Sequence, residues 1–130
     1  MLSKKLTGSG FSPLQAASLL GDVDNGIGNA GIAATSTTQG TAYAIGAVNS
    51  VFSVVAAGGA AILPNALQTG DELTVANLGA NALTVFPPVG GTVNNGAQNA
   101  GVSVLANSMA FFKAVPPASA AFSGLNYMAK

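Results

Sequence analysis

From Thr41 to the end of the chain, short apolar segments are separated by Gly, Pro and Asn residues, which favour turns. Turn signals recur about every 8–12 residues, and this pattern predicts an all-β fold, an antiparallel β-sandwich or jelly roll of about eight short strands. No fixed repeat period is visible, which argues against a solenoid. After a first strand near residues 32–38, we expect strands at residues 42–45, 50–57, 60–63, 72–77, 82–86, 102–105, 108–115 and 122–128.

Two of these segments predict a hairpin. Residues 72–77 place Leu73 and Val75 on one face, and residues 82–86 repeat that alternation after a short loop. A later segment, SMAFFKAV at residues 108–115, is apolar almost throughout. Because successive strand residues point to opposite faces, we expect one of Phe111 and Phe112 in the core and the other at a contact between subunits.

The N-terminal region has a different pattern. Ser12, Pro13 and Gln15 form a helix-start signal, and Gly21 follows where a helix-ending glycine belongs, so residues 13–20 are predicted to be a short helix. The residues before it read as an arm, and the turn-forming residues after it read as a linker. We therefore divide the chain into an arm, short helix and linker at 1–40 and a β-sandwich domain at 41–130.

The composition excludes several classes of function. The net charge is zero and only 6% of the residues are charged, which argues against a nucleic-acid partner. The chain has no Cys, His or Arg, so it lacks the usual catalytic base, the thiol nucleophile and the bidentate anion clamp. We expect no enzyme activity, no small-molecule substrate and no cofactor. A core of small side chains yields little apolar area per residue, so we expect burial between subunits to add stability.

Three motifs have weak functional interpretations. The segment Gly26–Gly31 matches the dinucleotide fingerprint G-x-G-x-x-G, but neither the strand before it nor the acidic residue after it is present, so we interpret it as a flexible loop. A calcium loop starting at Asp22 fails because its sixth and twelfth positions are Ile27 and Ala33. Asp71 and Glu72 are adjacent on a strand and therefore cannot converge on one substrate bond.

No membrane contact is expected. Lys4 and Lys5 resemble the start of a signal peptide, but no unbroken apolar run follows them. Residues 42–63 are long enough to cross a bilayer, yet they contain polar residues and a Gly-Gly pair and suit strands better.

Three segments together resemble small virion proteins of tailed bacteriophages, of the capsid decoration, cement or head-fibre type. They are TSTTQGTAYAI, AAILPNALQTGDELTVANLGANALTVFPPVGGTVNNGA and SMAFFKAV, and the resemblance covers about residues 32–128. It implies a β-sandwich, usually trimeric, on an icosahedral shell. The expected protein is thus a homotrimer that is made in the host cytoplasm, binds the major capsid protein on the outer capsid surface and stabilises the phage head.

The resemblance also implies an alternative, a receptor- or glycan-binding module of a fibre or tail. For the decoration protein, we expect the N-terminal segment to bind the capsid, because its apolar residues need a surface to cover and the helix is too short to persist alone. A competing interpretation is that this helix folds back onto its own domain or that of a neighbour. The predicted capsid-binding residues are Lys4, Lys5, Leu6, Phe11, Leu14 and Leu20.

Overall fold

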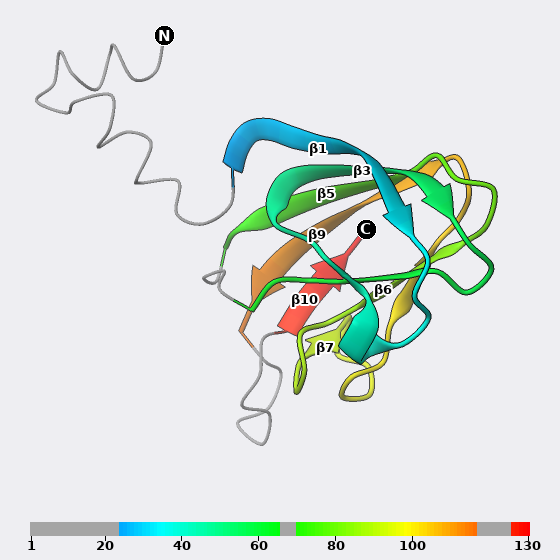
Figure 1. The fold of residues 1–130 in the computed structure, drawn as a ribbon. Coiled ribbons are helices and arrows are strands. Elements are labelled where there is room, and N and C mark those ends of the chain that lie inside the picture. The colour runs from blue at the N-terminus through cyan, green and yellow to red at the C-terminus, as the bar shows by residue number, and fades with distance from the viewer. Residues whose placement is uncertain (1–23, 66–69, 117–125) are drawn as a thin grey trace, which may run out of the picture.

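The computed structural model describes residues 24–65, 70–116 and 126–130, and they form two β-sheets (Figure 1). The chain is mostly β, with one 3₁₀ turn, η1 (Gln39–Thr41), and no α-helix within the described ranges. The six-stranded sheet has the order β1 (Asp24–Ala34), β3 (Ala47–Val55), β5 (Glu72–Asn77), β9 (Ser108–Val115), β10 (Asn126–Ala129) and β7 (Thr92–Val93). The four-stranded sheet has the order β2 (Tyr43–Ala44), β4 (Ala60–Ile62), β6 (Leu83–Phe86) and β8 (Val102–Val104).

Both sheets are mixed, which corrects the expectation of antiparallel sheets. From β1 to β6 the chain alternates between the two sheets, and each strand pairs in parallel with the next strand of its own sheet. The later strands add antiparallel pairs: β9 lies between β5 and β10, and β8 pairs with β6. The apolar alternation predicted which side chains are buried, but it contains no information on strand direction.

The predicted hairpin between residues 72–77 and 82–86 is wrong, because β5 and β6 belong to different sheets. The Asn77 side chain turns the chain between them: its amide donates to the carbonyl of Asn81 at 2.8 Å and to that of Val104 at 2.9 Å. The Gly79 backbone passes so close to β3 that an added Cβ would lie 2.7 Å from the Val55 nitrogen. At this close approach the segment between β5 and β6 passes β3 and enters the four-stranded sheet.

One hydrophobic core joins the sheets. Phe52, Leu73 and Phe112 contribute from the six-stranded sheet, and Leu83 and Val85 contribute from the four-stranded sheet. All five are at most 1% exposed. Each sheet therefore turns one apolar face inward, as the alternation in the sequence predicts.

The described region begins inside the stretch that we expected to be a linker. Residues 24–34 form β1, which pairs in parallel with β3, and its Ile32 and Ala34 are buried in the core. The match to the dinucleotide fingerprint, Gly26–Gly31, lies within this strand, so its interpretation as a flexible loop is wrong. The predicted arm and the helix at residues 13–20 lie outside the described residues.

Candidate interaction surface

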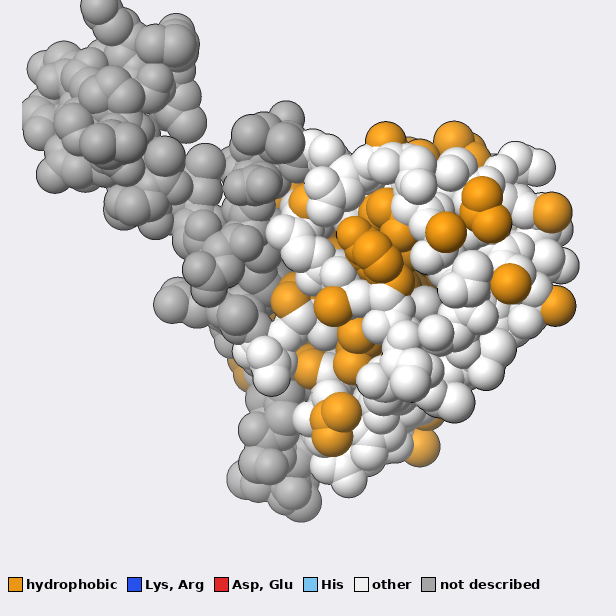
Figure 2. All heavy atoms as spheres, viewed as in Figure 1, with side chains coloured by type: hydrophobic (Ala, Val, Ile, Leu, Met, Phe, Trp, Pro, Cys, Tyr) orange, Lys and Arg blue, Asp and Glu red, His pale blue; other side chains and the backbone are white. Residues whose placement is uncertain are grey.

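The charged side chains that the structure describes gather on one part of the six-stranded sheet. Asp71 and Glu72 lie at the start of β5, Lys113 lies on β9, and Lys130 directly follows β10. By contrast, the described part of the face shown in Figure 2 displays no Lys, Arg, Asp or Glu side chain. The candidate site therefore lies on these three adjacent strands.

The outward side chains of β5, β9 and β10 form a surface that we call the Phe111 face. Glu72 pairs with Lys113 across the first two strands, and Phe111 exchanges two backbone hydrogen bonds with Lys130 across the last two, at 2.9 and 3.0 Å. Directly paired residues point to the same side of a sheet. The outward side chains thus form two rows, Glu72, Lys113 and Met128 in the first and Thr74, Phe111 and Lys130 in the second.

Large apolar side chains are exposed on this face. Met109 is 58% exposed, Phe111 52% and Met128 42%, whereas Phe112 is fully buried on the opposite side of β9. The prediction that Phe111 and Phe112 face opposite ways is confirmed. The contact between subunits that we expect at the outward phenylalanine stays a prediction.

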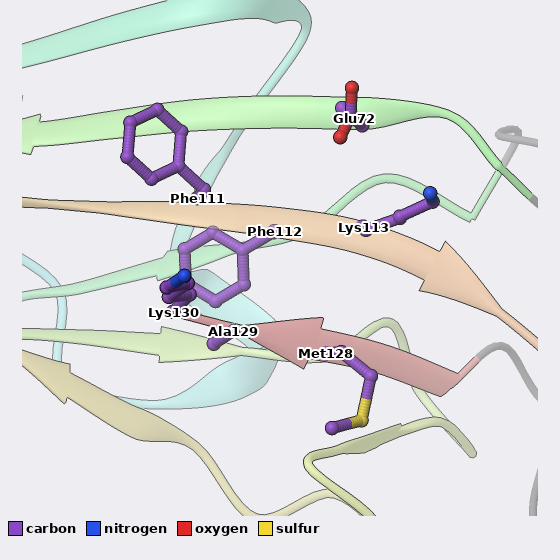
Figure 3. Close-up of a pocket in the computed structure, with 7 residues that line it drawn as sticks. All are labelled: Glu72, Phe111, Phe112, Lys113, Met128, Ala129 and Lys130. Atoms are coloured by element: carbon purple, nitrogen blue, oxygen red, sulfur yellow. The ribbon is translucent and has the colours of Figure 1, made fainter.

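A shallow pocket of about 230 Å³ lies on the Phe111 face. Figure 3 shows Glu72, Lys113 and Met128 toward one end of the strands and Phe111 and Lys130 toward the other. The volume is below the roughly 300 Å³ at which small-molecule sites begin. The pocket is therefore suited to one protruding side chain of a protein partner rather than to a whole small-molecule ligand.

The underside of β10 is held firmly in the core. Tyr127 is fully buried, and its hydroxyl donates to the carbonyl of Pro64. Burial raises the pKa of the Tyr127 hydroxyl well above its usual value, and the negative charge of Asp71 adds a smaller upward shift. The next residue back, Asn126, donates to the Asn95 side chain at 2.6 Å. These contacts fix the strand that carries Met128 and precedes Lys130.

A second polar cluster joins the loops around β7. The amide of Gln39 donates to the Pro87 carbonyl at 2.8 Å, and the amide of Gln98 donates to the Gly90 carbonyl at 3.0 Å. The backbone nitrogen of Gly90 in turn donates to the Asn99 side chain at 2.7 Å. These polar groups form hydrogen bonds with one another, so the cluster serves to connect the loops. The Phe111 face is therefore the stronger candidate for an interaction site.

The six predicted capsid-binding residues lie outside the described residues, so the structure brings none of them to the Phe111 face. Of the motifs considered in the sequence, Glu72 does join this face, where it lies opposite Lys113. In the described ranges, no group of three or more His, Cys, Asp or Glu side chains could hold a metal ion. Sequence reasoning missed Met128 and Lys130, because the pairing of β10 with β9 has no local sequence signal.

The comparisons with known proteins add no family. No protein-family model, curated protein or solved structure matches this chain. A search of the described part of the chain for a helix long and apolar enough to cross a membrane found none.

Proposed function

We propose that this chain is a structural virion protein of a tailed bacteriophage, a capsid decoration or cement protein. In this proposal a homotrimer, made in the host cytoplasm, binds the major capsid protein on the outer capsid surface and stabilises the head. The Phe111 face is the observation that carries the proposal: exposed apolar side chains beside charged ones on a fixed sheet are typical of protein–protein interaction sites. The sequence resemblance over residues 32–128 supplies the virion context.

We further propose that the two sheets pack face to face as a β-sandwich. Support comes from the shared core, in which Phe52 and Phe112 of one sheet join Leu83 and Val85 of the other.

The test of the function is retention on capsids. Purified protein is mixed with intact phage heads that lack it, the heads are pelleted, and bound protein is measured, with imaging of the heads for added density over the capsid lattice. Saturable retention and greater resistance of the heads to heat are expected. If the protein stays in the supernatant and instead binds sugars on a glycan array, it is the receptor- or glycan-binding module of the alternative, and the decoration proposal is wrong.

The proposed anchor to the shell is the segment 1–21, which carries Lys4, Lys5, Leu6, Phe11, Leu14 and Leu20. We expect a variant that lacks residues 1–21 to keep its oligomeric state and to lose retention on capsids. Normal retention of the truncated protein would show that the anchor lies elsewhere. Loss of the oligomer on truncation would instead favour the competing interpretation, in which the segment packs on its own domain or a neighbour's.

A further inference from the structure

We propose that the Phe111 face is the surface through which copies of this chain associate, around a rotation axis that runs parallel to β9. The inference deepens the proposed homo-oligomer and rests on that part of the proposed function. It does not require attachment to a capsid. The occupant of the face is a second copy of this chain.

The first argument is the composition of β9. Its inward residue Phe112 is fully buried, yet two of its outward residues, Met109 and Phe111, are also large and apolar, and the outward Lys113 follows them. An antiparallel strand with one solvent-exposed face alternates apolar and polar residues, whereas a strand that is buried on both faces is apolar almost throughout. The sequence of β9 therefore fits a strand whose second face is covered in the assembled protein.

The second argument is the placement of charge across the face. Glu72 lies on β5 at one edge of the Phe111 face, Lys130 follows β10 at its other edge, and Phe111 lies on the strand between them. The sheet itself continues beyond the face, with β3 and β1 beyond β5 and with β7 beyond β10. Rotation about an axis parallel to these strands brings the β5 edge of one copy next to the β10 edge of the following copy. The acidic edge then meets the basic edge, and the outward phenylalanines turn toward the axis.

The same features disfavour other occupants. The pocket of about 230 Å³ is small for a ligand, and Glu72 opposes the binding of a nucleic-acid backbone beside only two lysines. A second copy, in contrast, carries its own Glu72 at the edge of the face that the rotation turns toward Lys130. Self-association at this face therefore buries the apolar side chains at its centre and brings Glu72 of one copy near Lys130 of the next.

Cysteine cross-linking tests the geometry directly, because the chain has no Cys of its own. The variant Glu72→Cys/Met128→Cys places one thiol on each edge of the face, within the row that both residues share. Within one copy these positions lie two strand spacings apart, roughly 9.6 Å, which exceeds the limit of about 7 Å between Cα atoms for a disulfide. A disulfide in the double variant must therefore join two copies.

We expect mild oxidation of the double variant to yield covalent multimers on a non-reducing gel, with a closed ring as the largest species and its size giving the number of copies. The single variants Glu72→Cys and Met128→Cys are the matched controls and should stay monomeric on that gel. An uncross-linked double variant would overturn the proposal. Equally strong cross-linking of a single variant would overturn it too, because like edges would then meet.

A second experiment measures the apolar contact without cross-links. Phe111→Ser is compared with Leu105→Ser, which removes an exposed leucine (64% exposed) between β8 and β9, away from the outward rows of the face. In sedimentation velocity we expect the Phe111 variant to dissociate with a Kd raised at least about tenfold and the Leu105 variant to match the parent. Equal effects, or a parent that is monomeric at micromolar concentration, would overturn the inference.

These assays contain no capsids, so their outcome is separate from the test of the proposed function. An oligomer that forms through another surface and still binds heads would refute this inference alone. A protein that forms the predicted cross-links but is not retained on heads would refute the decoration proposal and leave the interface in place.

Discussion

Replacing Tyr127 by Phe removes a single buried hydroxyl and keeps the ring that fills the core. In the folded chain this hydroxyl donates to the carbonyl of Pro64, and the residue is fully buried. Loss of one such hydrogen bond, with its acceptor left partly buried, costs about 1–2 kcal/mol. We therefore expect Tyr127→Phe to lower the free energy of unfolding by about this amount at neutral pH.

The cost should depend on pH in a defined direction. Burial raises the pKa of the Tyr127 hydroxyl above its ordinary value of 10.0, so the unfolded chain loses this proton at a lower pH than the folded chain does. The stability that the hydroxyl contributes is complete below about pH 10 and falls by about 1.4 kcal/mol for each further pH unit. The Tyr127→Phe variant lacks this loss, so the difference between parent and variant narrows above about pH 10 and then reverses.

The assay is urea unfolding at one fixed protein concentration, followed by circular dichroism at about pH 7 and about pH 11. Tyr43→Phe is the control for removal of a tyrosine hydroxyl, because Tyr43 is half-buried and its ring packs edge-on against Phe52. A difference between the parent and Tyr127→Phe that is the same at both pH values would refute the reasoning. It would mean that the hydroxyl is exposed to water in the folded protein.

Two further predictions concern the backbone and use the same unfolding assay. Gly79→Ala should cost about 1–3 kcal/mol, since its Cβ would meet the backbone nitrogen of Val55 at 2.7 Å, whereas Gly46→Ala, with open space around it, should leave stability unchanged or slightly raised. Asn107 has a φ of 58°, so Asn107→Ala should cost about 1 kcal/mol and Asn107→Gly should be close to neutral. Equal stability of the two members of either pair would contradict these assignments.

The sequence predicted the individual strands better than their arrangement. The alternation of apolar residues predicted the bounds of β5 at both ends, because one buried face of a strand has a period of two residues. The almost wholly apolar run at residues 108–115 predicted the bounds of β9. The pair Asn95-Gly96 predicts a turn from the sequence, and the structure has one there: Asn94 and Asn95 have φ values of 55° and 57°, and the Gly96 nitrogen donates to the Val93 carbonyl. These features depend on residues that are close in the sequence.

The arrangement depends on contacts that are distant in the sequence. Leu73 and Leu83 each face the core, and this would hold whether their strands formed a hairpin or lay in different sheets. Two contacts favour the arrangement in different sheets over the hairpin. The side chain of Asn77 donates a hydrogen bond to the carbonyl of Val104, and Gly79 packs closely against β3. Neither contact has a signature in a single sequence.

The strand β1 was missed for a different reason. Its glycines and asparagines are poor strand formers, and the local pattern therefore predicts a loop over most of its length. Pairing with β3 and burial of Ile32 and Ala34 outweigh this local preference. The candidate site shows the same division, because the sequence predicted that Phe111 and Phe112 face opposite ways but did not predict the pairing of Phe111 with Lys130.

Because the chain has few charged residues, the charges next to the Phe111 face have a large influence on how two copies can meet. Charged side chains normally keep copies of a protein apart, and only 6% of the residues here are charged. Four of them lie on or next to three adjacent strands, with exposed apolar side chains between them: Glu72 and Lys113 lie on β5 and β9, Asp71 directly precedes β5, and Lys130 directly follows β10. Charges placed there restrict which orientations of two copies allow the apolar side chains to be covered. In the proposed association, the charges of this face select the geometry and its apolar side chains supply the affinity.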